Sequence, residues 1–238
     1  MSVLLRGAAS GIFLGLVALA PVTALAHGPY RSAESWTGFY AGLNLGGAWG
    51  DSDVTYPNFA ASNSSPDLGG VVGGGQLGFN KQWGGLVLGV EVSLTNGPRA
   101  NELAVGGVER QSIDVDFVFQ AVGRIGYAWG PTLLYGLGGY AAGNVDERLQ
   151  NTGSANAVFD KQWHNGWVAG AGIEHLVVPN VVLGIEWRHV DLGDDIHAGN
   201  NNFGAAVAVR NHRVDLNYDV VSARISYKFG DRRDEPLK

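Results

Sequence analysis

The stretch VSARISYKF, residues 221–229, alternates apolar and polar side chains without a break. Successive side chains of a β-strand point to opposite faces of its sheet, so Val, Ala, Ile, Tyr and Phe share one face here. The other face carries two Ser, one Arg and one Lys. A large, partly aromatic face opposite a polar one is typical of a strand with lipid outside and a narrow interior behind it.

Similar runs recur along the chain, and two kinds of connection alternate between them. We expect long connections at 51–68, 95–113, 145–161 and 193–211, and short turns at 83–85, 129–131 and 176–180. Long loops at one end and short turns at the other are typical of an up-and-down barrel in an outer membrane. The predicted strands are 38–50, 69–82, 86–94, 114–128, 132–144, 162–175, 181–192 and 212–229.

Composition supports this architecture. Of 238 residues, 37 are glycine and none is cysteine, and only 16% are charged. The chain is therefore neither a disulfide-stabilised domain nor an ordinary soluble one, in which about 25% of residues are charged. The sequence predicts an all-β protein, an eight-stranded antiparallel up-and-down transmembrane β-barrel.

Charged residues on the predicted inner faces form a balanced set, which we expect to make an interior ion-pair network. One interpretation is a selective polar lumen, and the other is a structural plug, because eight strands leave just enough room for their own side chains. We favour the plug. We expect inward glycines, Gly136 and Gly138 among them, to make room for these long side chains. The six charged residues are Glu91, Glu174, Glu186, Arg124, Arg188 and Arg224.

Aromatic residues gather near the predicted short turns. Trp and Tyr prefer a lipid–water interface, so this group indicates one edge of the membrane. Its members are Phe39, Phe79, Trp83, Tyr127, Trp129, Tyr227 and Phe229.

The first 26 residues have the pattern of a secretory signal peptide. Arg6 is the only charge, a short apolar stretch follows, and Ala24-Leu25-Ala26 supplies a cleavage pattern, so cleavage is expected between Ala26 and His27. The predicted organisation is then signal peptide 1–26, periplasmic segment 27–35, outer-membrane barrel 36–229 and polar tail 230–238. The expected location is the outer membrane of a Gram-negative bacterium.

The predicted strands resemble those of small alphaproteobacterial outer-membrane β-barrel proteins, described as porin-family, outer-membrane immunogenic or opacity-like. The resemblance implies eight strands with both termini in the periplasm. Members are described as structural, surface-antigenic, adhesive, weakly pore-forming or haem-binding. The family usually ends at a terminal Phe that belongs to the signal for the barrel-assembly machinery. Here nine residues follow Phe229, and this tail could lie free in the periplasm. The matching motifs are WTGFYAGLNLG (36–46), LGVE (88–91), GRIGYA (123–128), LYGLGGYA (134–141), GWVAGAGIE (166–174) and ARISYKF (223–229).

The sequence predicts no enzyme, because it has no Gly-x-Ser-x-Gly motif and no serine near a histidine on the same strand face. It predicts no cofactor or metal site and, with a formal charge of -6, no nucleic-acid partner. The expected role is structural and surface-interactive, with a narrow channel for small solutes or ions as the alternative. A haem-binding receptor that uses His164, His197 and His212 is third. Expected partners are outer-membrane lipid, lipopolysaccharide, the barrel-assembly machinery and a host or extracellular ligand at the loops.

Overall fold

The computed structural model describes residues 36–55, 67–103, 109–151, 157–197 and 212–229. Every regular element in these ranges is a β-strand. No helix in the ranges is long and apolar enough to cross a membrane. The predicted signal peptide, segment 27–35 and tail 230–238 lie outside the described residues.

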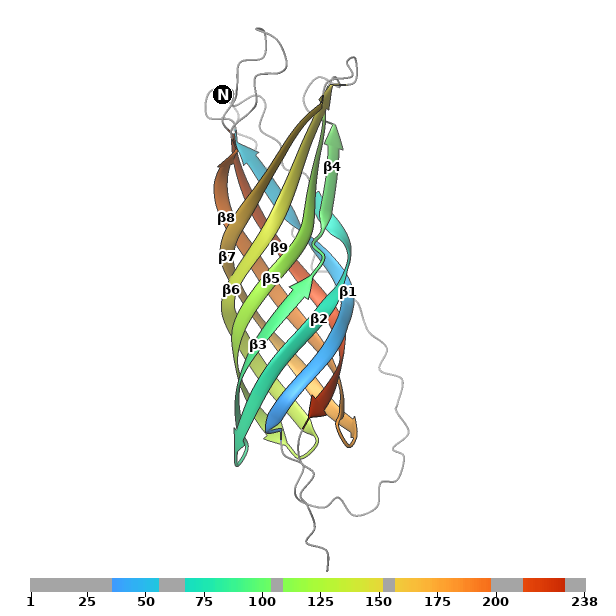
Figure 1. Ribbon diagram of the computed structural model, residues 1–238, viewed down its shortest axis with the longest axis vertical. Helices are drawn as coiled ribbons and strands as arrows, with labels where there is room; N and C mark the ends of the chain where they lie inside the picture. Colours follow the sequence, from blue (N-terminus) through green and yellow to red (C-terminus); the bar gives the residue numbers. More distant parts are fainter. Residues whose placement is uncertain (1–35, 56–66, 104–108, 152–156, 198–211, 230–238) are drawn as a thin grey trace, which may run out of the picture. The chain divides into compact units, whose positions relative to one another are not determined.

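The strands form one antiparallel sheet that closes on itself (Figure 1). β1 pairs with both β2 and β9, and from β5 to β9 each strand pairs with the next one along the chain. β3 and β4 lie one after the other between β2 and β5, so the ring has eight positions. The predicted eight-stranded barrel is confirmed. The strands are β1 (Gly38–Thr55), β2 (Asp67–Trp83), β3 (Leu86–Thr95), β4 (Arg99–Leu103), β5 (Glu109–Trp129), β6 (Thr132–Asn151), β7 (Ala157–Val178), β8 (Val181–His197) and β9 (His212–Phe229).

Asn96 bridges the break between β3 and β4. Its side-chain Oδ1 accepts a hydrogen bond from Gly73 N at 2.7 Å, and its Nδ2 donates to Val71 O at 3.0 Å. The amide side chain thus takes the place of a peptide group opposite β2. Pro98 lacks an N–H and can only accept, here from Val115 N at 3.2 Å. Local chemistry at Asn96 and Pro98 therefore divides one barrel position into two strands.

Much of what the sequence predicts as long connection is strand. β1 continues to Thr55, β6 to Asn151 and β8 to His197, while β5 begins at Glu109 and β7 at Ala157. The rest of each predicted long connection lies outside the described residues, apart from the break at 96–98. A transmembrane strand needs about 9–11 residues, so β5, β6 and β7 are roughly twice as long as a bilayer requires. Their far halves face water on the outside, where the apolar alternation used for the prediction is no longer required.

Two-residue turns join the strands at the opposite end, as the sequence predicts. They occupy 84–85, 130–131 and 179–180. Gly84, Gly130 and Asn180 have φ values of 59°, 58° and 74°, the left-handed region that tight hairpin turns need and that Gly and Asn tolerate.

The predicted alternation of faces holds, but the interior is not polar throughout. Large apolar side chains such as Leu43, Val90, Ile125 and Ile185 are exposed on the outer wall. Inside, the six predicted charges occupy the middle, with mainly apolar side chains on either side of them along the strands. A few polar side chains are buried in these outer parts as well: Asn80 and Lys228 near the short turns, and Asn144 and His164 toward the other end. The layer near the short turns comprises Trp36, Val87, Ala128, Leu133, Leu176 and Val182, and the layer toward the other end comprises Leu68, Val72, Val115, Val118, Val145, Val190, Leu192 and Leu216.

The expectation that Gly136 and Gly138 face inward is wrong. Leu133, Tyr135 and Leu137 take the inward positions of β6 and are buried, so the residues between them point outward. A Cβ at Gly136 or Gly138 would meet nothing closer than 3.8 Å. Both faces of this part of β6 are apolar or small, so alternation alone did not identify the inner one.

Aromatic side chains form two groups on the outer wall. The predicted group near the short turns is largely exposed, and Phe39 contacts Phe79 with ring centroids 4.8 Å apart. The second group, which the sequence analysis did not single out, lies farther along the strands: Trp49, Phe117, Tyr140, Trp163, Trp167 and Trp187. Two of its indoles donate to outward carboxylates, Trp167 Nε1 to Asp191 and Trp187 Nε1 to Asp219, each at 3.1 Å. The two groups mark both edges of an apolar band, as expected for an outer-membrane barrel.

Candidate functional site: a buried charge cluster

The structure brings together all six charged residues that the sequence places inside the barrel. Three carboxylates face three guanidinium groups, so the cluster is formally neutral, and every member is buried. Five different strands supply them: β3, β5, β7, β8 and β9. The members are Glu91, Arg124, Glu174, Glu186, Arg188 and Arg224, and we call them the charge cluster.

Glu91 lies at the centre of this cluster and contacts all three arginines. Its Oε2 is 2.5 Å from Arg224 Nη2 and 3.3 Å from Arg124 Nη1, and its Oε1 is 2.6 Å from Arg188 Nη2. β3 and β8 are four positions apart in the ring of eight, through β5, β6 and β7. The Glu91–Arg188 contact therefore connects opposite walls of the barrel.

The other two carboxylates complete the pairing. Glu174 Oε1 is 2.9 Å from Arg124 Nη2 and 3.6 Å from Arg224 Nε. Glu186 contacts Arg188 Nε at 2.7 Å and also pairs with Arg224 Nη1. Each charge has at least two partners of opposite sign, which a buried ion needs to offset the loss of water.

Two inward tyrosines join the cluster. Tyr40 donates its hydroxyl proton to Glu91 Oε2 at 2.7 Å, and Tyr135 donates to Glu186 Oε2 at 2.8 Å. The Arg124 guanidinium carbon lies 3.9 Å from the centroid of the Tyr135 ring, within the range of a cation–π contact. Neither tyrosine was assigned a role from the sequence. Tyr135 could have been found only with the inner face of β6 correctly assigned.

Glycine opposite a bulky residue makes the cluster fit in so narrow a barrel. Gly78 lies opposite Tyr40 on β1 and opposite Glu91 on β3. A Cβ at Gly78 would come within 2.3 Å of the Tyr40 ring. Likewise, a Cβ at Gly184 would be 2.7 Å from the Glu174 side chain. Glycine is required at these positions by close approach, in agreement with the sequence analysis.

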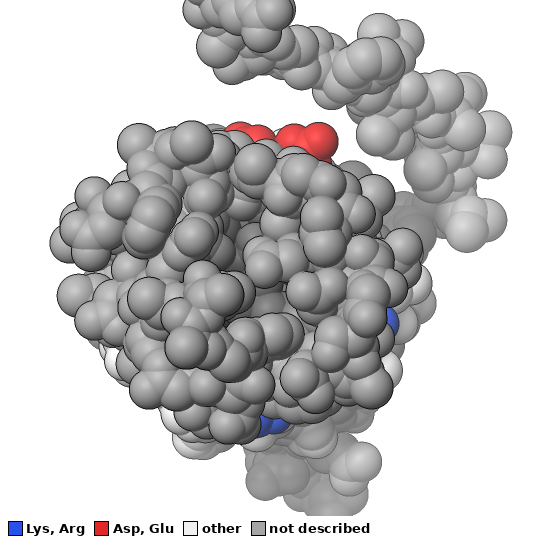
Figure 2. Space-filling model, turned by 90° about the horizontal axis from the view of Figure 1, so that it is seen from above, with Lys and Arg blue, Asp and Glu red and all other residues white. Residues whose placement is uncertain are grey.

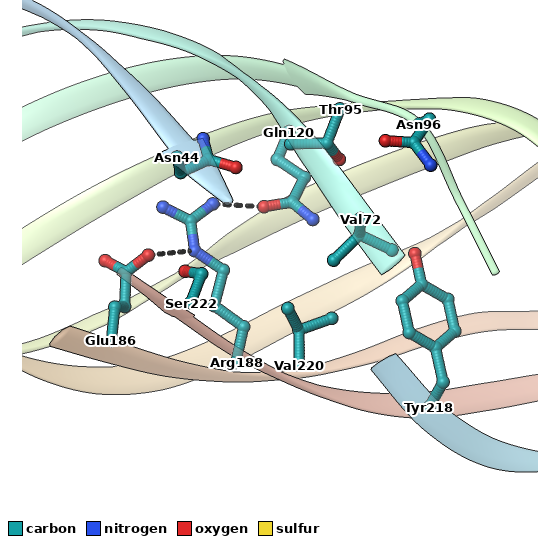
Figure 3. Close-up of a pocket in the computed structure, with 10 residues that line it drawn as sticks. All are labelled: Asn44, Val72, Thr95, Asn96, Gln120, Glu186, Arg188, Tyr218, Val220 and Ser222. Carbon is teal, nitrogen blue, oxygen red and sulfur yellow. Dashed lines mark hydrogen bonds and ion pairs between the residues drawn. The ribbon is translucent and has the colours of Figure 1, made fainter. Parts of the chain in front are cut away.

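A small cavity of about 20 Å³ lies beside the cluster on the side away from the short turns (Figure 3). This volume is close to that of a single water molecule. Arg188 lies at its wall between Glu186 and Gln120, with the Tyr218 ring across from them (Figure 3). Beyond Tyr218, away from the short turns, lie buried apolar side chains such as Leu216 and Leu192.

Lys161, on the outer wall beyond the second aromatic group, is paired at the surface with two carboxylates. Lys161 Nζ lies 2.7 Å from Asp116 Oδ2 and 3.2 Å from Asp146 Oδ2. These hydrogen bonds lower the pKa of the Asp116 carboxyl and raise the pKa of the Lys161 ammonium. In the view from above, described acidic side chains gather on one side of the molecule, and basic side chains are visible at separate points (Figure 2).

The remaining residues singled out from the sequence lie apart from the cluster. Tyr227 and Phe229 are on the outer face of β9, opposite Ala41 and Phe39 of β1, where the first and last strands close the ring. His164 is buried in β7, whereas His197 and His212 are paired in register between β8 and β9. No group of three or more metal-binding side chains occurs among the described residues.

Comparison with known proteins agrees with this geometry. Residues 12–229 match the family model of the outer membrane protein beta-barrel domain. The chain belongs to this family. Its relatives include a 31 kDa outer-membrane immunogenic protein of Brucella melitensis, 32% identical over 200 residues that cover 77% of this chain and 83% of the relative. A 22 kDa outer membrane protein of Rhizobium leguminosarum bv. viciae is 32% identical over 163 residues, covering 68% of this chain and 67% of the relative.

Among solved structures, the barrel is similar to the outer membrane protein OprG from Pseudomonas aeruginosa, with a TM-score of 0.51 and 14% identity. The similarity covers 81% of this chain and 96% of OprG and concerns the fold. The matches to family and relatives confirm the outer-membrane location predicted from the sequence.

Proposed function

We propose that this member of the family is a structural barrel with a closed lumen, which anchors its long extracellular strands and loops at the cell surface. The charge cluster carries the proposal, because its contacts join five strands across the interior. The mainly apolar layers on both sides of it add to the barrier. A hydrated solute needs a continuous polar path, and the cavity beside the cluster has room for about one water molecule.

Conductance of the mature protein in planar lipid bilayers tests the closed lumen. We expect no steady single-channel current from the wild type. Arg188→Ala removes the contact between opposite walls and should give measurable openings. Steady conductance in the wild type would refute the closed lumen and favour the alternative, a narrow channel.

Display at the surface also predicts which way the barrel faces. Outer-membrane barrels keep their short turns in the periplasm, so Lys161 should be outside the cell and Lys81, three residues before a short turn, should be inside. Both side chains are exposed. The printed name of the Brucella relative, an immunogenic protein, is consistent with surface display.

A membrane-impermeant amine reagent applied to intact cells tests this orientation. We expect Lys161 to be modified and Lys81 to remain unmodified until the outer membrane is permeabilised. Modification of Lys81 alone on intact cells would mean that the barrel is inserted the other way, and the long strands would not be displayed.

A further inference from the structure

A groove in the outer wall is distinct from the charge cluster. It has a volume of about 660 Å³ and crosses β1, β2, β3 and β5, with Phe229 of β9 at its edge. The groove is wide and open to the outside along its length and does not enclose a cavity. The groove lies on the face that meets lipid in a family member.

The shape of the groove follows from one row of neighbouring residues. Phe229, Phe39, Phe79, Val90 and Gly123 are successive partners in the sheet. Three phenylalanines stand at one end of this row and glycine at the other, so the wall falls away toward β5. Ala121, the next outward residue of β5, continues the low floor.

The side chains that face the groove are apolar. Tyr40 and Glu91 belong to its lining but point inward, where the tyrosine hydroxyl donates to the carboxylate at 2.7 Å. The groove therefore offers an occupant an apolar surface and few hydrogen-bonding groups. The tail that follows Phe229 is a poor candidate, because six of its nine residues are charged. A second barrel is also a poor fit, since two convex walls meet only along a narrow line.

We propose that the groove holds one acyl chain of a phospholipid from the periplasmic leaflet as a persistent ligand. The groove continues the lipid-facing band of the barrel, and its phenylalanine end belongs to the aromatic group near the short turns. Those turns mark the periplasmic edge, so the headgroup lies at that edge and the chain runs along Phe79 toward Gly123. A flexible chain fills such a depression more completely than a rigid surface does.

Native mass spectrometry of the full mature protein, purified from the outer membrane in mild detergent, tests the proposal. Gly123→Leu fills the groove, and Gly136→Leu is the matched control on the neighbouring strand. A Cβ at either glycine would meet no atom closer than 3.8 Å, so both variants should fold, as heat-modifiable gel mobility can verify.

We expect about one phospholipid on the wild type and on Gly136→Leu, and at least a fivefold lower retention on Gly123→Leu. Equal retention by all three proteins would overturn the proposal. Retention of lipid A in place of phospholipid, or a wild-type dimer that Gly123→Leu dissociates, would overturn it as well, because either result assigns the groove to another occupant.

Discussion

The charge cluster can be tested most directly at Glu91, the carboxylate with three arginine partners. Glu91→Gln keeps the size of the side chain and part of its hydrogen bonding but removes the negative charge. The buried interior would then hold three guanidinium groups against two carboxylates. One positive charge would be left without compensation in a region that water does not hydrate freely.

The distances give the size of the effect. At an effective dielectric constant of about 20, contacts of 2.5, 2.6 and 3.3 Å each correspond to about 5–7 kcal/mol of attraction. Desolvation of the four groups opposes most of this attraction. Removing one partner of a buried ion pair typically costs about 3–5 kcal/mol, and we expect Glu91→Gln to lower the free energy of unfolding by that amount.

The assay is reversible urea unfolding in lipid vesicles, followed by tryptophan fluorescence and by gel mobility. Lys161→Met is the matched control, since it also removes one charge with two partners, but at an exposed site. Exposed ion pairs contribute little, so this variant should unfold close to the wild type. If Glu91→Gln unfolds within about 1 kcal/mol of the wild type, the charge of Glu91 does not stabilise the barrel through its three arginines.

Three further outcomes are expected. Tyr135→Phe removes the hydroxyl that donates to a carboxylate of the cluster while keeping the ring, so urea unfolding should show a loss of about 1.5–3 kcal/mol. Gly78→Ala places a Cβ 2.3 Å from the Tyr40 ring and should cost about 1–3 kcal/mol by overpacking, whereas an unchanged unfolding midpoint would contradict the inward position of this glycine. The pKa of Asp116 is lowered by Lys161, so the stabilisation from their pair is complete above the unfolded-state value of about 3.9 and is lost as the pH falls through the lower native pKa. Carboxyl chemical shifts recorded by NMR against pH should show this lowering in the wild type and lose it in Lys161→Met.

The membrane-spanning part of the barrel could be predicted because lipid imposes a strict rule on it. Each outward residue there must be apolar, so a polar residue such as Glu186 or Arg224 must point inward. The alternation of side chains along each strand is therefore sufficient to predict that all six members of the charge cluster lie on the inner face. Which carboxylate meets which guanidinium depends on strand tilt and register, and the sequence carries no direct signal for these.

The rule that outward residues are apolar did not predict two features: the inner face of β6 and the full length of the long strands. In β6, residues 133–143 are apolar or small on both faces, so Tyr135 could not be distinguished as inward and Gly136 was misplaced. Beyond the second aromatic group, away from the short turns, the outer wall meets water, so the outward residues of β5, β6 and β7 need not be apolar. Polar stretches there look like loops although their backbones are paired.

The position of the charges also specifies strand register. A sheet whose outer face is uniformly apolar gains little from one alignment over another that differs by two residues, because such a slip keeps every side chain on its own face. Glu186 and Arg188 lie two residues apart on the inner face of β8, and Glu186 pairs with Arg224 of the adjacent strand β9. A two-residue slip in one direction would bring Arg188 to the place of Glu186 and set two guanidinium groups against each other, and a slip in the other direction would bring Gly184 there and leave Arg224 without this carboxylate. We infer that the cluster fills the lumen and also disfavours barrels whose strands are paired in a shifted register. An apolar plug of equal volume would fill the lumen but would not discriminate between registers.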